Sequence, residues 1–386
     1  MTIPYGRQDI SAADIDAVVE VLRSDFLTQG PAVPTFEQAV AARVGAAHAV
    51  AVNSATSALH IACLALGLGE GDSLWTVPNT FVASANCGRY CGADVDFVDI
   101  DPATWNISIP ELRRKLQQAE AERRLPKIVV PVHFSGLPTD QEAIWELSQQ
   151  YGFRVLEDAS HAIGAERNGE AVGSCRWSDI TVFSFHPVKI ITTGEGGMAL
   201  TIDRRLADAM AMLRSHGITR DAGVMTEKNP GPWYYEQLEL GYNYRMTDIQ
   251  AALGASQLAR LEAFVTRRRE LAARYDALLA GLPLRLPVRD DRVRSSRHLY
   301  VVRLRLDKIG RSHRHVFEAL RAAGIGVNLH YIPVHLQPYY RALGFAEGHC
   351  PEAERYCAEA ISLPLYPALT ESNQDYIVAT LRELLK

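Results

Sequence analysis

The chain contains no CxxC motif and no set of cysteines and histidines with the spacing of a zinc site. Its six cysteines are scattered, at positions 63, 87, 91, 175, 350 and 357. We therefore expect no metal site and no disulfide framework. The pattern fits a reduced, cytoplasmic protein whose thiols are mostly buried.

An uninterrupted apolar run long enough to cross a membrane is also missing. The most apolar stretch, residues 48–69, is broken by Asn53, Thr56 and His60. The N-terminus carries acidic residues where a signal peptide needs an apolar core. We expect no membrane-spanning segment and no secretion signal.

Positive charge is not in excess. The 40 lysines and arginines are outnumbered by 45 aspartates and glutamates, which gives a net charge of -5. A protein that binds nucleic acid normally shows a basic patch, so nucleic acid is not an expected partner. A phosphate-binding GxxxxGK[ST] loop is absent as well.

A regular alternation of strands and helices is present between about residues 48 and 202. Apolar runs predict strands, and helical patterns lie near 57–68, 107–121 and 140–151. The predicted strands are "HAVAVN", "DSLWTV", "DVDFVDI", "KIVVPVHF", "FRVLED", "DITVFSF" and "GMALTI". Such alternation predicts an α/β fold with a mainly parallel sheet flanked by helices on both faces.

The pattern changes at about residue 247. A long amphipathic helical stretch follows, with Gly254 as a candidate break, and then a strand at "RHLYVVRLRL", a helix at "RHVFEALRAAGI" and a strand at "GVNLHYIP". We therefore predict a large domain over 14–246 and a smaller α+β C-terminal domain over 247–386, with residues 1–13 packing nearby. Residues 222–238 form a long loop rich in Pro, Gly and aromatic residues, typical of a functional lid or an interface strap.

Two residues at strand ends suggest a cofactor. Asp158 ends one predicted strand and Lys189 follows the next, at the edge where open α/β sheets bind ligands. A lysine amine with a lowered pKa forms Schiff bases with aldehydes such as pyridoxal phosphate (PLP). That cofactor is an electron sink only while its pyridine nitrogen stays protonated, which a buried carboxylate achieves. A helix cap is the alternative role for Asp158.

Donors for a phosphate lie in "VNSATSALHIA", residues 52–62, where a strand is followed by small hydroxyl residues and a helix. Backbone N–H groups at 55–57 would point out of the helix start, with Thr56 or Ser57 adding a hydroxyl. An ordinary helix cap has the same geometry, so this alternative stays open. Ser184 is a second candidate donor, and Phe81 follows a strand end, where it would stack on the pyridine face or belong to the core.

Taken together, these segments resemble the DegT/DnrJ/EryC1/StrS family of PLP-dependent nucleotide-sugar aminotransferases. The match runs in order from "LTQGP" at 27–31 to "ISLPLYP" at 361–367. It includes "NSATSAL", "TFVASAN", "EDASHAIGA", "FSFHPVKIITTGEGG", "RSHGI", "GYNYRMTDIQAALG" and "HYIPVH". Four segments look most like the subgroup that makes UDP-4-amino-4,6-dideoxy-N-acetyl-β-L-altrosamine, a pseudaminic acid precursor. Their sequences are "LTQGP", "LRSHGITRD", "PWYYEQ" and "HYIPVHLQPYY".

The resemblance implies a PLP-dependent transferase of fold type I that acts as a homodimer with shared active sites. It implies that Lys189 is the Schiff-base lysine, that Asp158 is the partner of the pyridine nitrogen and that Phe81 stacks on the ring. Some relatives replace the lysine with histidine and are dehydratases. This chain keeps the lysine, which favours transamination.

The same resemblance implies how the rest of the cofactor is held. Ala55, Thr56 and Ser184 match the phosphate cradle, and Asn243 matches an asparagine that reaches the phosphate from the other subunit. His161 lies at a position beside the ring that is often Gln or His.

The implied reaction transfers an amino group from L-glutamate to C4 of a UDP-linked 4-keto-6-deoxy-N-acetyl sugar. His186, His330 and Tyr331 are candidate substrate contacts because the resemblance places them near the sugar-nucleotide cleft. Arg245 is a candidate for the donor carboxylate, and an ion pair with Asp248 at i,i+3 is an equally good interpretation.

Other functions remain open at this stage. A related aminotransferase that uses a GDP- or dTDP-linked 4-keto sugar is the nearest alternative. A PLP lyase, aldolase or desulfurase would share the fold, although no cysteine motif in a loop suggests a desulfurase. A sugar-nucleotide-binding homologue without catalysis is the third, and Lys189 together with Asp158 argues against it.

Overall fold

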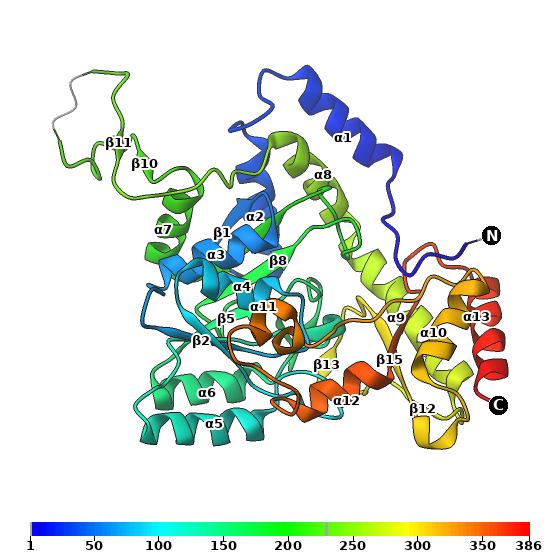
Figure 1. Ribbon diagram of the computed structural model, residues 1–386. Helices are drawn as coiled ribbons and strands as arrows, with labels where there is room; N and C mark the ends of the chain where they lie inside the picture. Colours follow the sequence, from blue (N-terminus) through cyan, green and yellow to red (C-terminus); the bar gives the residue numbers. More distant parts are fainter. Residues whose placement is uncertain (1, 228–230) are drawn as a thin grey trace.

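The computed structural model of the protein describes residues 2–227 and 231–386. A sheet of seven strands forms its centre, in the order β1-β9-β8-β5-β4-β2-β3 (Figure 1). The strands are β1 (His48–Val52), β2 (Ser73–Thr76), β3 (Asp94–Phe97), β4 (Ile128–Val130), β5 (Arg154–Asp158), β8 (Ile180–Ser184) and β9 (Gly197–Thr201). Each lies within one of the predicted strands, because apolar β-branched runs of this length bury both faces of a sheet.

Six of these strands run in the same direction, and β9, which lies between β1 and β8, runs in the opposite direction. β8 pairs in parallel with β5, whereas β9 runs antiparallel to both β8 and β1. The connection over residues 185–196 contains no helix, so the chain turns back beside β8 instead of crossing the sheet. This return places Ser184 opposite Gly197 and leaves Lys189 in the loop between the two strands.

Helices cover the sheet on both sides, and neighbouring strand residues belong to different cores. Val182 packs in the core that contains Leu59 of α3, whereas Phe183 packs with Phe36 of α2. The helices of this part are α1 (Ala12–Arg23), α2 (Ala32–Val44), α3 (Ala55–Ala65), α4 (Ala83–Tyr90), α5 (Ile109–Ala121), α6 (Gln141–Tyr151), α7 (Arg204–Arg214) and η1 (Phe134–Gly136). This alternation of period two is why the strands read as continuous apolar runs.

The helical stretch after residue 247 is two helices, α8 (Asp248–Ala259) and α9 (Leu261–Leu279). The break lies at Arg260, so the expected break at Gly254 is wrong. Gly254 lies inside α8, where a Cβ would stand 2.6 Å from the ring of Phe36 and 2.7 Å from Thr193. The glycine therefore permits close packing of α8, although glycine costs a helix some stability.

A smaller α+β part with its own core follows α9. Its sheet has the order β12-β14-β15 and is antiparallel throughout. Its elements are β12 (Leu284–Arg285), β14 (Tyr300–Leu304), η2 (Leu306–Lys308), α10 (His313–Ala322), η3 (Val334–Leu336), α11 (Pro338–Arg341), α12 (Pro351–Glu359), β15 (Ala360–Leu363) and α13 (Glu371–Leu384). The expected strand at 326–333 is wrong. That segment forms only an isolated bridge from Asn328 to Ser362 of β15, which completes the sheet instead.

Two small sheets complete the structure. One joins β6 (Glu166–Arg167), β7 (Glu170–Ala171) and β13 (Val293–Arg294), and the other pairs β10 (Ile218–Thr219) with β11 (Glu236–Gln237). β10 and β11 lie at the base of an arm, residues 215–227 and 231–243, that projects from the molecule at the upper left of Figure 1. Residues 228–230 of the expected 222–238 loop lie outside the described residues.

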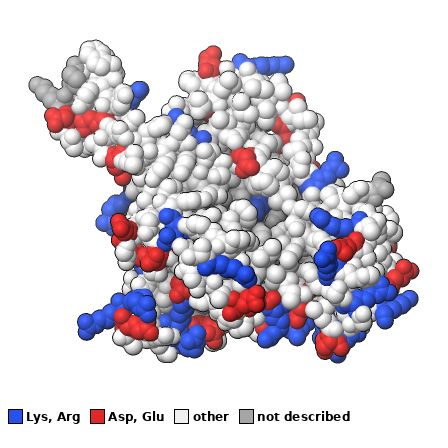
Figure 2. All heavy atoms as spheres, viewed as in Figure 1, with Lys and Arg blue, Asp and Glu red and all other residues white. Residues whose placement is uncertain are grey.

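The charged residues are of both signs. Figure 2 shows Lys and Arg interspersed with Asp and Glu over the visible face. Among the helices of the described residues, none is both long enough and apolar enough to cross a bilayer. The described residues also contain no group of three or more His, Cys, Asp or Glu residues that could hold a metal ion.

Candidate active site

A cavity of about 600 Å³ lies at the carboxyl ends of β5 and β8, against the start of α3. It brings together all the predicted site residues except Ser57, Asn243 and Arg245. The predicted residues that line it are Ala55, Thr56, Phe81, Asp158, His161, Ser184, His186, Lys189, His330 and Tyr331. Asn243 lies instead at the base of the arm, where it forms a bridge with Ser215.

Lys189 enters this cavity from the loop between β8 and β9. Its backbone N–H donates to the carbonyl of His186 at 2.9 Å, which fixes the turn that carries it. Burial lowers the pKa of Lys189 to about 8, against the opposing attraction of the Asp158 carboxylate. Among the described residues, the amine of Lys189 forms no ion pair. A substantial fraction of this amine is therefore neutral and nucleophilic just above neutral pH.

Asp158 is buried at the end of β5, and its two carboxylate oxygens have separate donors. The hydroxyl of Ser84 donates to one oxygen at 2.6 Å, and the backbone N–H of Ser160 donates to the other at 3.0 Å. Ser84 belongs to α4, which the sequence did not reveal as a helix. A buried carboxylate fixed in this way suits a cationic ring nitrogen as its third partner.

The start of α3 meets β9 at very short range. A Cβ on Gly197 would stand 2.4 Å from the backbone nitrogen of Ala55, so glycine is required for this approach. Ser54 caps the helix and accepts from the N–H of Ser57 at 3.1 Å. The N–H groups of Ala55 and Thr56 lie in the first turn, which has no intrahelical acceptors. Together with the Ser184 hydroxyl they form a donor set that suits a phosphate.

The alternative interpretation of Ser57 as a phosphate donor is not supported. Its hydroxyl donates to the side-chain oxygen of Asn53 at 2.7 Å, inside the turn that precedes α3. Capping and phosphate binding therefore use different residues of the same segment.

Two histidines form one wall of the cavity. The rings of His161 and His298 lie 4.4 Å apart, and Tyr331 Oη lies 3.2 Å from His161 Nε2. Burial, and then the charge of Lys189, hold the pKa of His161 well below its usual value. Burial and the neighbouring His161 do the same for the pKa of His298. Both rings are therefore neutral near pH 7.

Sequence reasoning missed His298. It follows the segment "RSSR" with no flanking motif, and it reaches the cavity only because residues 135 and 136 bind its loop. Its N–H donates to the carbonyl of Ser135 at 2.9 Å, and Ser296 Oγ donates to the His161 carbonyl at 2.8 Å. No local pattern in the sequence predicts that His298 lies in this cavity, because its position depends on contacts with residues far away in the chain.

The remaining predicted residues differ in how freely they face the cavity. Phe81 is 59% exposed, so it presents its ring to the cavity and does not belong to the core. Burial lowers the pKa of His330 to about 3, and its Nδ1 lies 2.8 Å from Ser362 Oγ. His186 is exposed at the rim, with Nε2 3.9 Å from Glu195.

Arg245 forms no ion pair with Asp248 in the part of the chain that the structure describes. The Asp248 carboxylate accepts instead from the N–H groups of Gly30 and Ala32, both at 2.8 Å. The interpretation of Arg245 as an i,i+3 partner is therefore wrong.

The residues fit PLP. The group carries a phosphate, an aldehyde and an aromatic ring with a basic nitrogen, and the cavity offers a helix-terminal cradle, a lysine of lowered pKa and a fixed carboxylate. Within the described residues, the buried Nδ1 of His161 has no hydrogen-bond partner, which leaves a polar atom of the wall for a ligand.

Comparison with known proteins agrees with this chemistry. A family model described as the DegT/DnrJ/EryC1/StrS aminotransferase family matches residues 8–382. The chain is 41% identical to the spore coat polysaccharide biosynthesis protein SpsC of Bacillus subtilis (strain 168), over 100% of this chain and 97% of SpsC.

Two solved structures are closely similar. Helicobacter pylori PseC, an aminotransferase involved in the biosynthesis of pseudoaminic acid, matches with a TM-score of 0.90 and 29% identity, over 100% of this chain and 99% of PseC. The PLP-form of the putative sugar aminotransferase Spr1654 from Streptococcus pneumoniae matches with a TM-score of 0.88 and 29% identity, over 100% and 98% of the two chains.

Proposed function

Because the protein belongs to the DegT/DnrJ/EryC1/StrS aminotransferase family, we propose that it transfers an amino group from L-glutamate to C4 of a UDP-linked 4-keto-6-deoxy-N-acetyl sugar. It is a PLP-dependent sugar aminotransferase of fold type I. The proposed product is UDP-4-amino-4,6-dideoxy-N-acetyl-β-L-altrosamine, a precursor of pseudaminic acid. The likeness to PseC supports this substrate, and the observation that carries the reaction type is the lysine of lowered pKa beside a fixed carboxylate.

Different residues of the cavity have different roles in transamination. Bound PLP supplies an electron sink for the carbanion formed at the carbon that carries the amino group. Lys189 Nζ would take the proton from that carbon and deliver it to the carbon that carries the aldehyde in free PLP, and its pKa of about 8 keeps both protonation states within reach near neutral pH. Asp158 holds the proton on the ring nitrogen, while Ser84 and the N–H of Ser160 keep its carboxylate in place.

Other residues position the cofactor and the sugar. We assign Ala55, Thr56 and Ser184 to the phosphate, and Phe81 to one face of the ring. His161 contributes a neutral ring at the wall.

His186, His330 and Tyr331 are the proposed substrate contacts. His186 is the most exposed of the three and is the best placed to meet a large nucleotide sugar at the rim. His330 and Tyr331 lie deeper and limit the space for the sugar ring.

The proposed assembly is a homodimer in which Asn243 of the partner subunit completes the phosphate cradle. The arm supports it, because Trp233 is 73% exposed and Leu240 is 78% exposed on a segment that projects from the molecule (Figure 1). Apolar groups exposed in this way are typical of a surface that another chain covers. The six free cysteines suit a reducing compartment, so we propose a cytoplasmic location.

The dimer is tested by Leu240→Asp, with Leu306→Asp as a matched exposed control on η2. Sedimentation should show a dimer for the wild type and the control, and monomer for Leu240→Asp. A dimer unchanged by Leu240→Asp would contradict the role of the arm.

A substrate panel tests the sugar and the nucleotide. The purified enzyme is incubated with glutamate and with UDP-, GDP- or dTDP-linked 4-keto-6-deoxy sugars, and the products are identified by NMR. We expect turnover with the UDP-linked N-acetyl sugar. The NMR couplings of the product then define the configuration of the new amine at C4. Preferred turnover of a GDP or dTDP sugar would replace the proposed substrate by the nearest alternative, and release of ammonia or cleavage products would indicate a lyase.

A further inference from the structure

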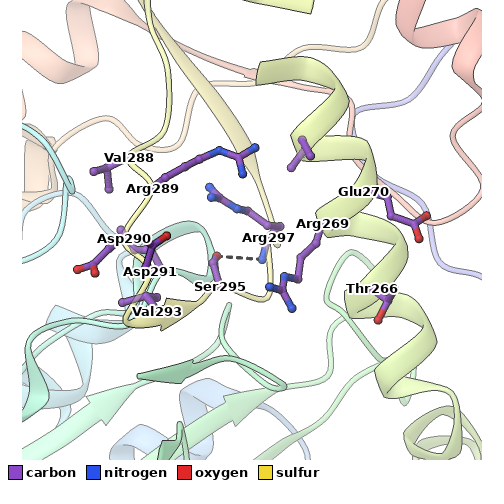
Figure 3. Close-up of a pocket in the computed structure, with 13 residues that line it drawn as sticks. Thr266, Arg269, Glu270, Val288, Arg289, Asp290, Asp291, Val293, Ser295 and Arg297 are labelled. Carbon is purple, nitrogen blue, oxygen red and sulfur yellow. Dashed lines mark hydrogen bonds between the residues drawn. The ribbon is translucent and has the colours of Figure 1, made fainter. Parts of the chain in front are cut away.

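A second cavity, of about 420 Å³, lies between α9 and residues 288–297, away from the catalytic cavity (Figure 3). Three arginines line it, Arg269 from α9 and Arg289 and Arg297 from the other wall. We call it the arginine cavity. It shares no lining residue with the catalytic cavity.

The arginines of this cavity are not matched by carboxylates. Arg289 is paired, because its Nε donates to Asp276 at 2.7 Å. In the described part of the chain, the guanidinium groups of Arg269 and Arg297 have no ion pair. Asp276 also accepts from the hydroxyl of Tyr300 at 2.5 Å, so this carboxylate already has two donors.

The acidic residues of the wall do not supply the missing charge. Asp290 pairs with Arg292 at 2.8 Å, and Glu270 pairs with Arg267 at 3.3 Å. Asp291 is exposed and forms no ion pair with any described residue. Two unpaired guanidinium groups therefore face one cavity that holds a single unpaired carboxylate, the exposed Asp291.

The environment of Arg297 makes this imbalance costly. Burial lowers the pKa of Arg297; the charge of Asp276 opposes this shift, and the charges of Arg289 and Arg269 add to it. An arginine with an ordinary pKa above 12 stays charged despite such a shift. Like charges that repel one another in a partly buried space are stabilised when an anion binds between them.

The backbone directs Arg297 into this cavity at a conformational cost. Its φ of 50° lies in the left-handed region, which non-glycine residues seldom adopt, and its N–H donates to Ser295 Oγ at 3.1 Å. The next residue, His298, lines the catalytic cavity. Successive side chains of one turn thus enter two different cavities.

We propose that the arginine cavity binds the phosphate group of a small metabolite, with Arg269 and Arg297 as the ligands. A phosphate group carries nearly two negative charges near pH 7, which matches two unpaired guanidinium groups. Arginine forks bind phosphate oxygens in pairs, with stronger hydrogen bonds than neutral donors make. The volume exceeds that of phosphate alone, and Val288 and Val293 offer an apolar surface to the rest of the metabolite.

The test uses the holoenzyme saturated with PLP, so that the cradle at α3 is filled. Isothermal titration calorimetry with inorganic phosphate, pyrophosphate and UDP is compared for the wild type, Arg269→Gln, Arg297→Gln and the double variant. Arg292→Gln is the matched control, because Arg292 lies in the same segment but pairs with Asp290 and does not line the cavity.

We expect at least one of the probes to bind to the wild type and to Arg292→Gln, with affinity lower by at least about tenfold in Arg269→Gln. A response to phosphate alone would identify the oxyanion as sufficient, and a response only to UDP would identify a nucleotide. The α9 variant keeps the test independent of any folding defect in Arg297→Gln. The proposal is overturned if the wild type and the double variant bind each of the three probes alike, or if none of the probes binds, whereas UDP binding that remains in the double variant belongs to the catalytic cavity.

Discussion

The catalytic cavity and the arginine cavity are lined by the neighbouring residues His298 and Arg297, but burial affects the charged groups of the two cavities differently. In the catalytic cavity it lowers the pKa of Lys189 to about 8 and keeps His161 and His298 neutral. In the arginine cavity it lowers the pKa of Arg297 without removing its charge. A lysine or a histidine, whose ordinary pKa lies within a few units of 7, therefore becomes partly or wholly neutral when buried, whereas a buried arginine stays charged and is stabilised by an anion.

The largest difference between the cavities should appear when the lysine is removed. Lys189→Ala should lower turnover by roughly 10³-fold or more, since it removes the group that moves the proton. Part of the cofactor binding should remain, because the cradle and Asp158 are unchanged. Steady-state kinetics and cofactor absorbance measure both, with the exposed Lys308→Ala as control. Near-normal turnover of Lys189→Ala would remove the lysine from the mechanism.

The next largest effect should follow the loss of the charge at Asp158. Asp158→Asn should lower turnover by about 10²-fold, and far more than it lowers PLP occupancy, because an amide does not hold a proton on the ring nitrogen. Ser84→Ala should lie between this variant and the wild type, since it removes one hydrogen bond to the carboxylate. Equal losses of turnover and occupancy in Asp158→Asn would indicate a purely structural role.

Lowering the pH should reduce the free energy of unfolding, because the buried histidines of the catalytic cavity are neutral in the folded protein. Because the folded-state pKa of His298 is lowered, its contribution to stability is complete above about pH 6.5 and is lost as the pH falls toward the folded value. Each such histidine costs about 1.4 kcal/mol of unfolding free energy per pH unit below that point.

Denaturant unfolding between pH 5.5 and 7.5 measures this slope. His298→Asn should reduce the pH dependence, and His315→Asn, at an exposed position, should leave it as in the wild type. An unchanged slope in His298→Asn would mean that this ring is not the neutral group we describe.

The smallest effect on catalysis should come from the arginine cavity. Arg269→Gln should change the rate of amino transfer in phosphate-free buffer by less than about twofold, since surface substitutions away from a site usually shift free energies little. Initial rates with saturating glutamate measure it. A large loss of rate would show that the two cavities do not act separately.

Much of the fold could be predicted from the sequence because the patterns that specify the strands are local. Each apolar run that predicted a strand of the central sheet contains one, and the motifs at its strand ends lie around one cavity. What failed depended on distant contacts. Gly254 lies inside α8, where it packs against Phe36, and the helix breaks at Arg260 instead. Residues 326–333 form no strand, and β15 pairs with β14 in the small sheet.

The same rule separates the site residues. Asp158 and Lys189 stand in short recognisable motifs, so the sequence suggested them. Ser84 contributes only through a hydrogen bond to a carboxylate 74 positions away, and His298 only through its ring contact with His161. No local sequence pattern around Ser84 or His298 predicts these partners.

One measurement tests the central claim that Lys189 and its cavity perform amino transfer. The absorption spectrum of the purified holoenzyme is recorded before glutamate, after glutamate and after the UDP-linked 4-keto sugar. We predict that the visible cofactor band falls with glutamate and returns with the sugar, and that Lys189→Ala shows neither change. A band that glutamate leaves intact, or no band after PLP is added, would contradict the account.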